Sequence, residues 1–328
     1  MIQRILLIRP DKIGDLVLTL PMATAIKASI PEAKVAFLVR EYTAPLLLLA
    51  TDVDETVTYD PDLSLVKTIS LLRSAQADAI FFFGSKFKLT LAAFLARIPL
   101  RIGRAYWWYS FLYNRKIREH RKTSEFNEAE YNVRMLKEIG IVAAETPLPC
   151  LDRDILPPIH LPDSPYVVLH ITTGGSAQAW NSEHFNELAA WLKQEFDCPI
   201  ILTGTPEDNE FLFRISERMK HSSCDVHIHS QNTLLELASL LASARLVVSG
   251  STGPGHLAAA LGTATIGLFP GVVSLSKERW GFRGKKTINI SPLTNPKKDC
   301  PHCSDCACIG EITIAQVINA IHDLNIQK

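Results

Sequence analysis

The sequence has no excess of charge of either sign, no long hydrophobic run and no dense set of cysteines. Its 34 Lys and Arg residues balance 34 Asp and Glu residues, so no net charge draws the whole molecule to nucleic acid or anionic lipid. No stretch approaches the roughly 18 apolar residues of a membrane-spanning helix, and the first apolar run is too short for a signal peptide. The seven cysteines lack the pattern of a secreted disulfide protein, so we expect a reducing, cytoplasmic location.

The chain has 328 residues, of which 47% are hydrophobic and 21% charged, as in ordinary globular proteins. This length exceeds what one hydrophobic core usually serves, which favours two domains. Short runs rich in Val, Ile and Phe alternate with segments of helical period, so we expect parallel sheets covered by helices on both faces. The expected strands are 4–8, 34–39, 56–59 and 78–83 in the first half, and 166–171, 199–204, 245–250 and 263–269 in the second.

Residues 144–165 hold six prolines and little periodicity, which suits an extended linker between domains. We therefore expect an α/β protein with two Rossmann-like domains facing each other across a cleft. The first domain would cover residues 1–155 and the second residues 156–328. A final amphipathic helix over 312–325 could pack back on the first domain.

In parallel α/β sheets ligands bind at the carboxyl ends of strands, so the loops at these ends are the candidate sites. The loop SGSTGPGHLAAALG, residues 249–262, joins a strand to a helix whose first N–H groups suit a phosphate. Its glycines allow the backbone to approach a ligand closely, while Ser251 and Thr252 add hydroxyls and His256 adds a ring donor. An ordinary helix cap with a glycine turn is the alternative.

Two further loops of the second half have related features. HITTGGSAQAW, residues 170–180, offers the hydroxyls of Thr172, Thr173 and Ser176, which fit a diphosphate jointly with the previous loop. An ordinary strand-to-helix turn is the alternative there. ILTGTPEDNE, residues 201–210, brings Glu207 and Asp208 to the end of a strand, where an acidic side chain commonly binds ribose hydroxyls. The alternative is acidity favoured by a helix N-terminus.

In the first half, the loop RPDKIGDLVLTLP at residues 9–21 joins the first strand to its helix. Gly14 lets this loop turn sharply, which would put Asp15 at the start of the helix and facing the cleft. A carboxylate within hydrogen-bond reach of an acceptor hydroxyl can act as a general base. The alternative is that Asp15 only caps the helix.

Taken together, IGDLVLTLP near the N-terminus and STGPGHLAAALG in the second half resemble glycosyltransferase family 9, the ADP-heptose:lipopolysaccharide heptosyltransferases. The resemblance covers nearly the whole chain. It implies the GT-B fold and inverting transfer from a nucleotide-sugar donor such as ADP-heptose to a lipopolysaccharide core or related lipid-linked glycan, with no cofactor and no metal. It makes Asp15 the base. By the same match, Thr172 and Thr173 bind phosphate, and Glu207 or Asp208 holds the ribose. Asn232 flanks the adenine. Thr252, Gly253 and His256 form the helix start that binds the diphosphate.

Two positions depart from the pattern that this family shows in its lipid A core enzymes. Those enzymes have a lysine where this chain has Gln178, and an aspartate where it has Ser251. Losing one charge of each sign changes which hydroxyls the pocket can recognise, so the donor sugar could differ from heptose. Two alternative functions stay open: a nucleotide-sugar or glycan binding protein without transferase activity, and a nucleotide-sugar 2-epimerase.

The segment KKDCPHCSDCACIGEI, residues 297–312, contains four closely spaced cysteines, Cys300, Cys303, Cys306 and Cys308. CxxC steps of this kind hold zinc or iron–sulfur clusters in other proteins. These ligands are crowded, however, and a second CxxC pair at a distance is missing. We therefore expect reduced structural cysteines, with a metal site as the alternative.

The stretch RIGRAYWWYSFLYNRKIREHRK, residues 101–122, interleaves aromatic with basic side chains. Nucleic acid would suit such a mixture, but the balanced charge of the chain argues against that partner. We expect contact with an anionic, lipid-linked acceptor and peripheral contact with the inner face of the cytoplasmic membrane. A packed helix with a solvated face is the alternative.

Overall fold

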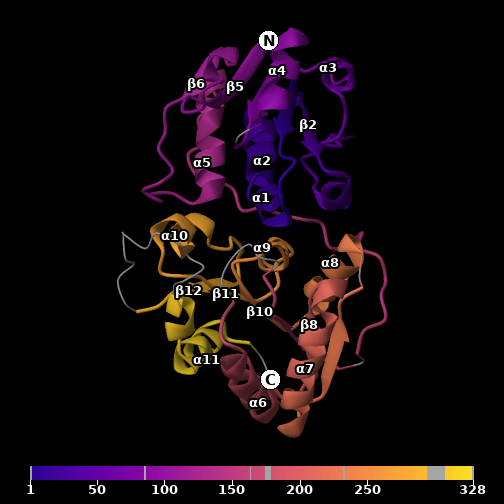
Figure 1. Cartoon of the computed structure of the whole chain (residues 1–328), viewed down its shortest axis with the longest axis vertical. Helices are drawn as coiled ribbons and strands as arrows, with labels where there is room; N and C mark the ends of the chain where they lie inside the picture. The colour runs from indigo at the N-terminus through magenta and orange to yellow at the C-terminus, as the bar shows by residue number, and fades with distance from the viewer. Residues whose placement is uncertain are drawn as a thin grey trace. The chain divides into compact units, whose positions relative to one another are not determined.

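The computed structural model describes residues 2–84, 86–162, 164–173, 179–231, 233–293 and 307–326. The chain forms two compact units, each built on its own sheet (Figure 1). Unit 1 comprises residues 1–121 and 128–151, and unit 2 comprises residues 122–127 and 152–328. The short segment 122–127 thus interrupts unit 1 in the sequence and belongs to unit 2 by its contacts.

Unit 1 is built on a parallel six-stranded sheet in the order β3-β2-β1-β4-β5-β6. This is the strand order of doubly wound nucleotide-binding folds. Its strands are β1 (Arg4–Ile8), β2 (Lys34–Val39), β3 (Glu55–Thr58), β4 (Ala79–Phe82), β5 (Leu100–Arg104) and β6 (Arg115–Ile117). Its α-helices are α1 (Ile13–Val17), α2 (Leu20–Ser29), α3 (Leu65–Ser74), α4 (Phe87–Leu95) and α5 (Glu128–Arg134), and its 3-10 helices are η1 (Glu41–Leu49), η2 (Ser110–Leu112) and η3 (Met135–Ile139).

Unit 2 repeats this plan with a parallel sheet in the order β12-β11-β10-β7-β8-β9. Its strands are β7 (Val167–His170), β8 (Ile200–Thr203), β9 (Val226–His229), β10 (Leu246–Gly250), β11 (Thr265–Leu268) and β12 (Thr287–Ile290). Its α-helices are α6 (Ser182–Phe196), α7 (Asn209–His221), α8 (Leu234–Ser243), α9 (Gly253–Ala260), α10 (Lys277–Trp280) and α11 (Ile314–Asp323), with η4 (Pro206–Asp208), η5 (Val273–Leu275) and η6 (Ala307–Glu311). The expected pair of Rossmann-like domains is confirmed.

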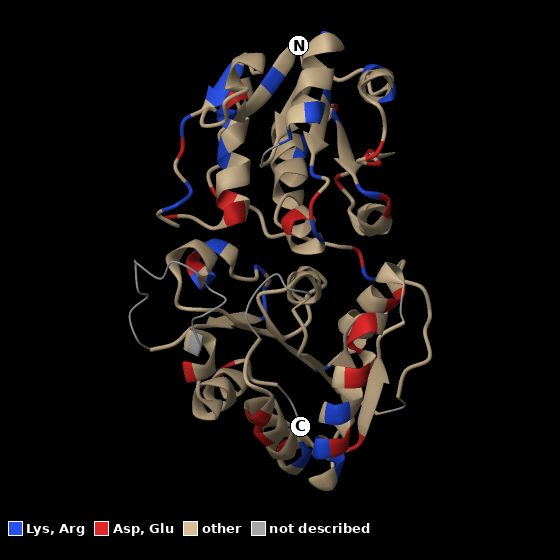
Figure 2. Cartoon of the chain, viewed as in Figure 1, with Lys and Arg blue, Asp and Glu red and all other residues tan. Residues whose placement is uncertain are grey.

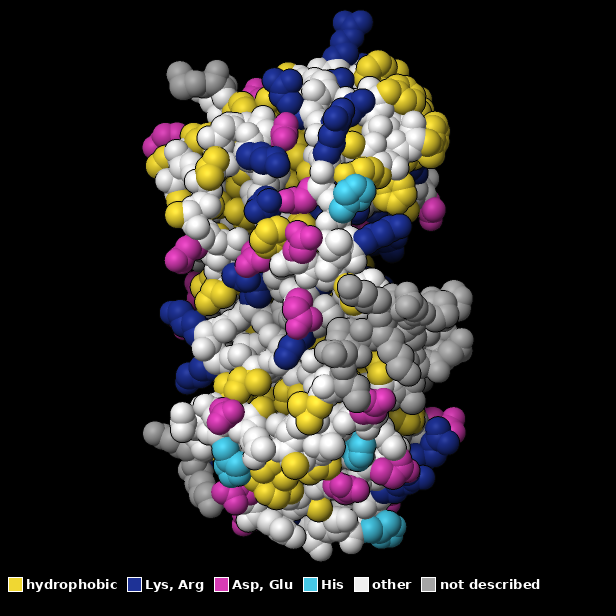
Figure 3. All heavy atoms as spheres, turned by 90° about the vertical axis from the view of Figure 1, so that its left-hand side faces the viewer, with side chains coloured by type: hydrophobic (Ala, Val, Ile, Leu, Met, Phe, Trp, Pro, Cys, Tyr) yellow, Lys and Arg dark blue, Asp and Glu magenta, His cyan; other side chains and the backbone are white. Residues whose placement is uncertain are grey.

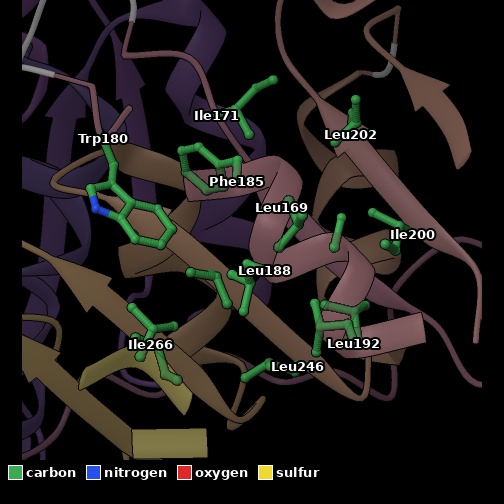
Figure 4. Close-up of a cluster of buried hydrophobic side chains, with 14 of the residues drawn as sticks. Leu169, Ile171, Trp180, Phe185, Leu188, Leu192, Ile200, Leu202, Leu246 and Ile266 are labelled. Carbon is green, nitrogen blue, oxygen red and sulfur yellow. The ribbon is translucent and has the colours of Figure 1, made fainter. Parts of the chain in front are cut away.

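The core of unit 2 shows why the sequence forms these layers. Helix α6 begins where the Asn181 side chain accepts a hydrogen bond from Glu183 N at 3.0 Å. Its apolar residues recur at helical spacing and form one face, so that Phe185 and Leu188 pack beside Leu169 of the sheet (Figure 4). The final helix α11 adds Val317, Ala320 and Ile321 to the same core. The buried face of α11 is therefore occupied by unit 2.

The aromatic and basic stretch at residues 101–122 does not form the helix that we considered as an alternative. It contains β5, η2 and β6, the last strands at one edge of the sheet. Gly103 in β5 allows the Tyr113 ring to lie against the strand, because a Cβ at this position would be 2.4 Å from Tyr113 Cζ. Within the described ranges, no helix has both the length and the apolar character needed to cross a bilayer.

Candidate functional site

In each unit a group of candidate residues lies where the strand order reverses. In unit 1 the reversal is between β1 and β4, and α1 with Asp15 follows β1 directly. In unit 2 it is between β7 and β10, whose following loops contain Thr172, Thr173 and residues 251–256. Loops at such a reversal run in opposite directions and leave room for a ligand beyond the carboxyl ends of the strands. The loops after β1, β7 and β10 therefore occupy the two positions where a doubly wound sheet binds ligands, whereas the loop with Glu207 and Asp208 follows β8.

Asp15 lies in α1 with 26% of its side chain exposed. Arg9 Nη2 donates to Asp15 Oδ1 at 2.6 Å, and Arg9 Nε donates to the backbone oxygen of Asp15 at 3.1 Å. Burial raises the pKa of Asp15, the Arg9 guanidinium opposes this, and the Asp11 and Glu128 carboxylates add to the rise. A hydrogen bond from the backbone N–H of Lys12 lowers the same pKa, but the N-cap residue of α1 is Lys12 and not Asp15. Asp15 thus combines a contact at the helix start with the raised proton affinity of a general base.

Arg9 is held by a buried set of charges that the sequence did not reveal. Its side chain is 4% exposed, its Nη2 lies 3.8 Å from Glu128 Oε1, and its guanidinium lies 5.2 Å from the centre of the Phe83 ring. Glu128 also pairs with the buried Arg121. A guanidinium that is paired on two sides has little freedom to turn. Arg9 therefore fixes the direction of the Asp15 carboxylate.

A pocket of about 630 Å³ lies in unit 1 at the carboxyl ends of β2 and β3. Tyr42, on its wall, donates a hydrogen bond from its hydroxyl to the backbone oxygen of Asp11 at 2.9 Å. Burial raises the pKa of Tyr42, the charge of Arg40 opposes this, and the charges of Asp15 and Asp11 add to the rise. The sequence analysis missed this pocket, whose lining residues are Arg40, Glu41, Tyr42, Thr58, Tyr59, Asp60, Pro61 and Leu63.

In unit 2 the turn from β10 into α9 has the features expected of a phosphate site. Thr252 is the N-cap residue of α9 but makes no side-chain cap, because its hydroxyl lies 2.7 Å from Ser249 Oγ instead. The first N–H groups of a helix have no partner within the helix and attract anions. A Cβ on Gly255 would lie 2.1 Å from Phe282 Cζ, so glycine is required for this ring to pack against the helix start. The helix-cap alternative is not supported for the Thr252 side chain.

His256, in the first turn of α9, is 4% exposed and packs edge-on against Phe282 at 4.7 Å between ring centres. Burial lowers its pKa to about 3, so the ring is neutral at neutral pH and has one N–H to donate. Its Nδ1 is buried without a hydrogen-bond partner in the described part of the chain. A buried polar atom of this kind is usually paired.

The β7 loop begins at His170, which is 8% exposed and whose Nδ1 lies 2.9 Å from Thr203 Oγ1 of β8. Burial lowers the pKa of His170 to about 4, against the opposing effect of the Asp208 charge. Thr172 is buried and Thr173 half-buried directly after the strand. Ser176 and Gln178 lie outside the residues that the structure describes.

The depressed pKa of His170 predicts that acid destabilises the protein. The unfolded histidine takes up a proton near pH 6.5, whereas the folded one stays neutral down to about 4. The stabilisation is therefore complete above pH 6.5 and is lost as the pH falls toward the folded pKa, at about 1.4 kcal/mol per unit. Urea unfolding measured from pH 7 to 5 should show this loss, and His170→Asn should reduce its slope. An identical slope in His170→Asn and in the exposed-site control His160→Asn would contradict the assignment.

The β8 loop places Asp208 in a helix cap. Its Oδ2 accepts hydrogen bonds from Thr205 N at 2.8 Å and Thr205 Oγ1 at 2.9 Å, which form a capping box at the start of η4. Glu207, next to it, is exposed. A second pocket of about 480 Å³ lies beside this loop at the end of β9. Its lining residues are Asn209, Phe213, Ile228, His229, Ser230 and Gln231, and Asn232, the next candidate along the chain, lies outside the described residues.

Of the clustered cysteines only Cys308 is described, and its Sγ accepts a hydrogen bond from Gly271 N at 3.3 Å. Cys300, Cys303 and Cys306 lie outside the described residues. The described ranges contain no group of three or more His, Cys, Asp or Glu side chains arranged to hold a metal ion.

Two Rossmann-like units with loops of this kind at their switch points define a GT-B type protein. The chain matches the family model Glycosyltransferase family 9 (heptosyltransferase) over residues 66–306. It therefore belongs to glycosyltransferase family 9 and is a heptosyltransferase-like glycosyltransferase. This membership favours sugar transfer over the two alternatives, a binding protein and a 2-epimerase.

Individual relatives agree with this assignment. The chain is 28% identical to a Haemophilus influenzae protein named as a glycosyltransferase of unproven activity, over 85% of each chain. It is 22% identical to Lipopolysaccharide heptosyltransferase 3 of Escherichia coli, over 78% of this chain and 79% of the relative. The solved structure of Escherichia coli ADP-heptose lipopolysaccharide heptosyltransferase II shares the fold with a TM-score of 0.79 at 20% identity, over 98% of both chains.

Proposed function

We propose that the protein transfers a sugar, with inversion, from a nucleotide sugar of the ADP-heptose kind to a hydroxyl of a lipopolysaccharide-type glycan. The observation that supports this most directly is Asp15, a half-buried carboxylate of raised pKa that follows β1 and is oriented by Arg9. Relatives named as lipopolysaccharide heptosyltransferases support the substrate class.

In the proposed reaction Asp15 takes the proton of the acceptor hydroxyl as its oxygen attacks the anomeric carbon of the donor. The new bond is the glycosidic C–O bond, and the bond that breaks joins the anomeric carbon to the nucleoside diphosphate. The electron pair leaves with the diphosphate, whose growing negative charge is stabilised at the start of α9 by backbone N–H groups, Thr252 and His256. No metal or other cofactor is part of this scheme.

The donor's nucleoside is assigned to the pocket beside β9, next to Asp208 and Glu207, and its phosphates to Thr172, Thr173 and the Gly253 turn. The sugar end is the least determined part of the donor. Gln178 and Ser251 replace the lysine and aspartate of the resembling lipid A core enzymes, so a sugar other than heptose is the second candidate.

The acceptor is assigned to the pocket of about 630 Å³ in unit 1. Arg40 can pair with an anionic group of the glycan, and the rings of Tyr42 and Tyr59 can pack against sugar faces. The contact of Tyr42 with Asp11 links this pocket to the segment that contains Asp15.

A thermal-shift screen of ADP-, UDP- and GDP-sugars tests the donor assignment. A ligand at a hundred times its dissociation constant stabilises the folded protein by about 2.7 kcal/mol, so ADP-heptose or another ADP-sugar should raise the melting temperature by several degrees. The shift should persist in EDTA, because the proposed diphosphate site consists of protein donors alone. A shift with UDP- or GDP-sugars and none with ADP-sugars would overturn the donor class.

A further inference from the structure

One stretch of unit 1 differs in charge from the rest of this balanced chain. Residues 79–118 contain eight Lys and Arg residues and no Asp or Glu. They extend from β4 through α4 and β5 to β6, and Figure 2 shows Lys and Arg positions along β5 and β6. Lys86 pairs with Asp11, while the other seven make no ion pair with any described carboxylate. Their positive charge is therefore not neutralised by an ion pair within the described residues, although Lys88 and Arg101 donate hydrogen bonds to backbone oxygens.

The same stretch exposes large apolar side chains. Trp108 is 73% exposed, Phe111 67% and Phe87 41%, although such residues are normally buried. The Phe87 and Trp108 rings lie 4.8 Å apart, and both contact the buried Tyr109 ring at 5.4 and 5.5 Å. Figure 3 shows hydrophobic side chains beside Lys and Arg along one margin of the unit drawn at the top. The buried Tyr109 ring thus supports the exposed rings of Phe87 and Trp108.

The exposed end of α4 extends this surface. Phe94 and Leu95 are half exposed, and Arg101 lies 5.3 Å from the centre of the Phe94 ring. The Arg101 Nε donates to the backbone oxygen of Leu112 at 2.9 Å, which brings the end of α4 next to η2 and Phe111. We call the surface formed by Phe87, Phe94, Leu95, Trp108 and Phe111 the aromatic patch.

We infer that the aromatic patch and its cations dock unit 1 on the surface of an anionic lipid bilayer. Rings that protrude this far can insert into the boundary between head groups and acyl chains, while each nearby Lys or Arg is attracted by anionic head groups. Binding of this kind strengthens with the apolar area that is buried and with the electrostatic attraction to anionic lipids, and this surface supplies both contributions. This inference extends the proposed function, because a lipid-linked acceptor would then be met at the surface where it resides.

Single-stranded nucleic acid is the competing partner for a basic and aromatic surface. It binds by stacking bases on exposed rings along a positive groove. Leu95 adds aliphatic surface to the patch, on which a base has no ring to stack. Hydrocarbon contact accounts for aromatic and aliphatic exposure alike, so the bilayer is the better match.

Vesicle flotation tests this inference on the full chain. The protein should float with vesicles of phosphatidylcholine mixed with phosphatidylglycerol, and far less with phosphatidylcholine alone. The double variant Trp108→Gln and Phe111→Gln should bind about tenfold more weakly, and Arg115→Gln with Lys116→Gln at least about fivefold more weakly. The matched control Leu48→Gln with Val142→Gln removes two equally exposed apolar side chains elsewhere in unit 1 and should bind as the parent does.

Because the altered side chains are exposed, the variants should keep the parent's melting temperature. Their ADP-sugar thermal shift should also be unchanged, because the donor loops belong to unit 2. Equal flotation of parent and patch variants, or no flotation of the parent, would overturn the docking inference and leave the proposed transfer intact. Binding of the parent to single-stranded RNA, lost in the same variants and without flotation, would assign the patch to nucleic acid. Loss of the ADP-sugar shift in the parent would instead overturn the proposed function.

Discussion

Replacing Asp15 with asparagine should lower kcat by about 10² to 10⁴, the usual contribution of a positioned general base. Asparagine keeps the size of the side chain and can still accept a hydrogen bond from Arg9, but it cannot take the acceptor's proton. Donor binding should be unchanged, because Asp15 belongs to unit 1 and the donor loops to unit 2. Steady-state transfer measured alongside the donor-induced thermal shift separates these two effects.

The pH profile gives the same variant a second readout. In the parent, kcat/KM should fall on the acid side as Asp15 takes up a proton, and burial places this pKa above that of an ordinary aspartate. The Asp15→Asn variant should lose this acid limb from its residual activity. Asp323→Asn, an exposed carboxylate at the end of α11, is the matched control and should behave as the parent. Full transfer by Asp15→Asn with normal donor binding would show that another group is the base.

The central strands could be predicted from the sequence because each of them is marked by its own short run of apolar residues. Residues 5–8 and 167–169 are apolar on both faces, as strands covered by helices on both sides must be, and they form most of β1 and β7. The strands that the sequence analysis missed, β5, β6, β9 and β12, lie toward the sheet edges. In β6 two of three residues are basic and exposed, so no apolar pattern marked it. Edge strands need only one buried face, which leaves a weak signal.

The candidate site likewise contains residues that the sequence could predict and residues that only the fold brings together. Asp15 and Thr252 follow strands directly, so a local pattern of strand, turn and helix was enough to point to them. Glu128 lies far along the chain from Arg9, and only the fold brings its carboxylate to 3.8 Å from that guanidinium. For Asp208 the local sequence was ambiguous, because it is compatible with a ribose contact and with a helix cap. The structure shows the cap contacts of this carboxylate with Thr205.

Replacing His256 with phenylalanine should lower kcat/KM by about 10² to 10³, the cost of removing one preorganised donor that faces developing charge. Phenylalanine preserves the aromatic contact with Phe282, so the fold at the start of α9 should remain. Because the pKa of His256 is about 3, the parent ring is neutral throughout the working range. The loss should therefore be independent of pH above about 5, which distinguishes a hydrogen-bond donor from a charged ring.

His322→Phe is the matched control for this variant, since His322 also packs edge-on against an aromatic ring, Trp191, at 5.6 Å. It lies in α11, away from the strand-to-helix loops of the sheet, and its replacement should leave transfer and donor binding unchanged. If His256→Phe transferred at the parental rate with an unaltered ADP-sugar shift, the leaving diphosphate could not depend on this ring. The backbone N–H groups of α9 and the Thr252 hydroxyl would then be left to stabilise it. A loss of transfer in both variants would indicate that altered packing in unit 2 is the cause.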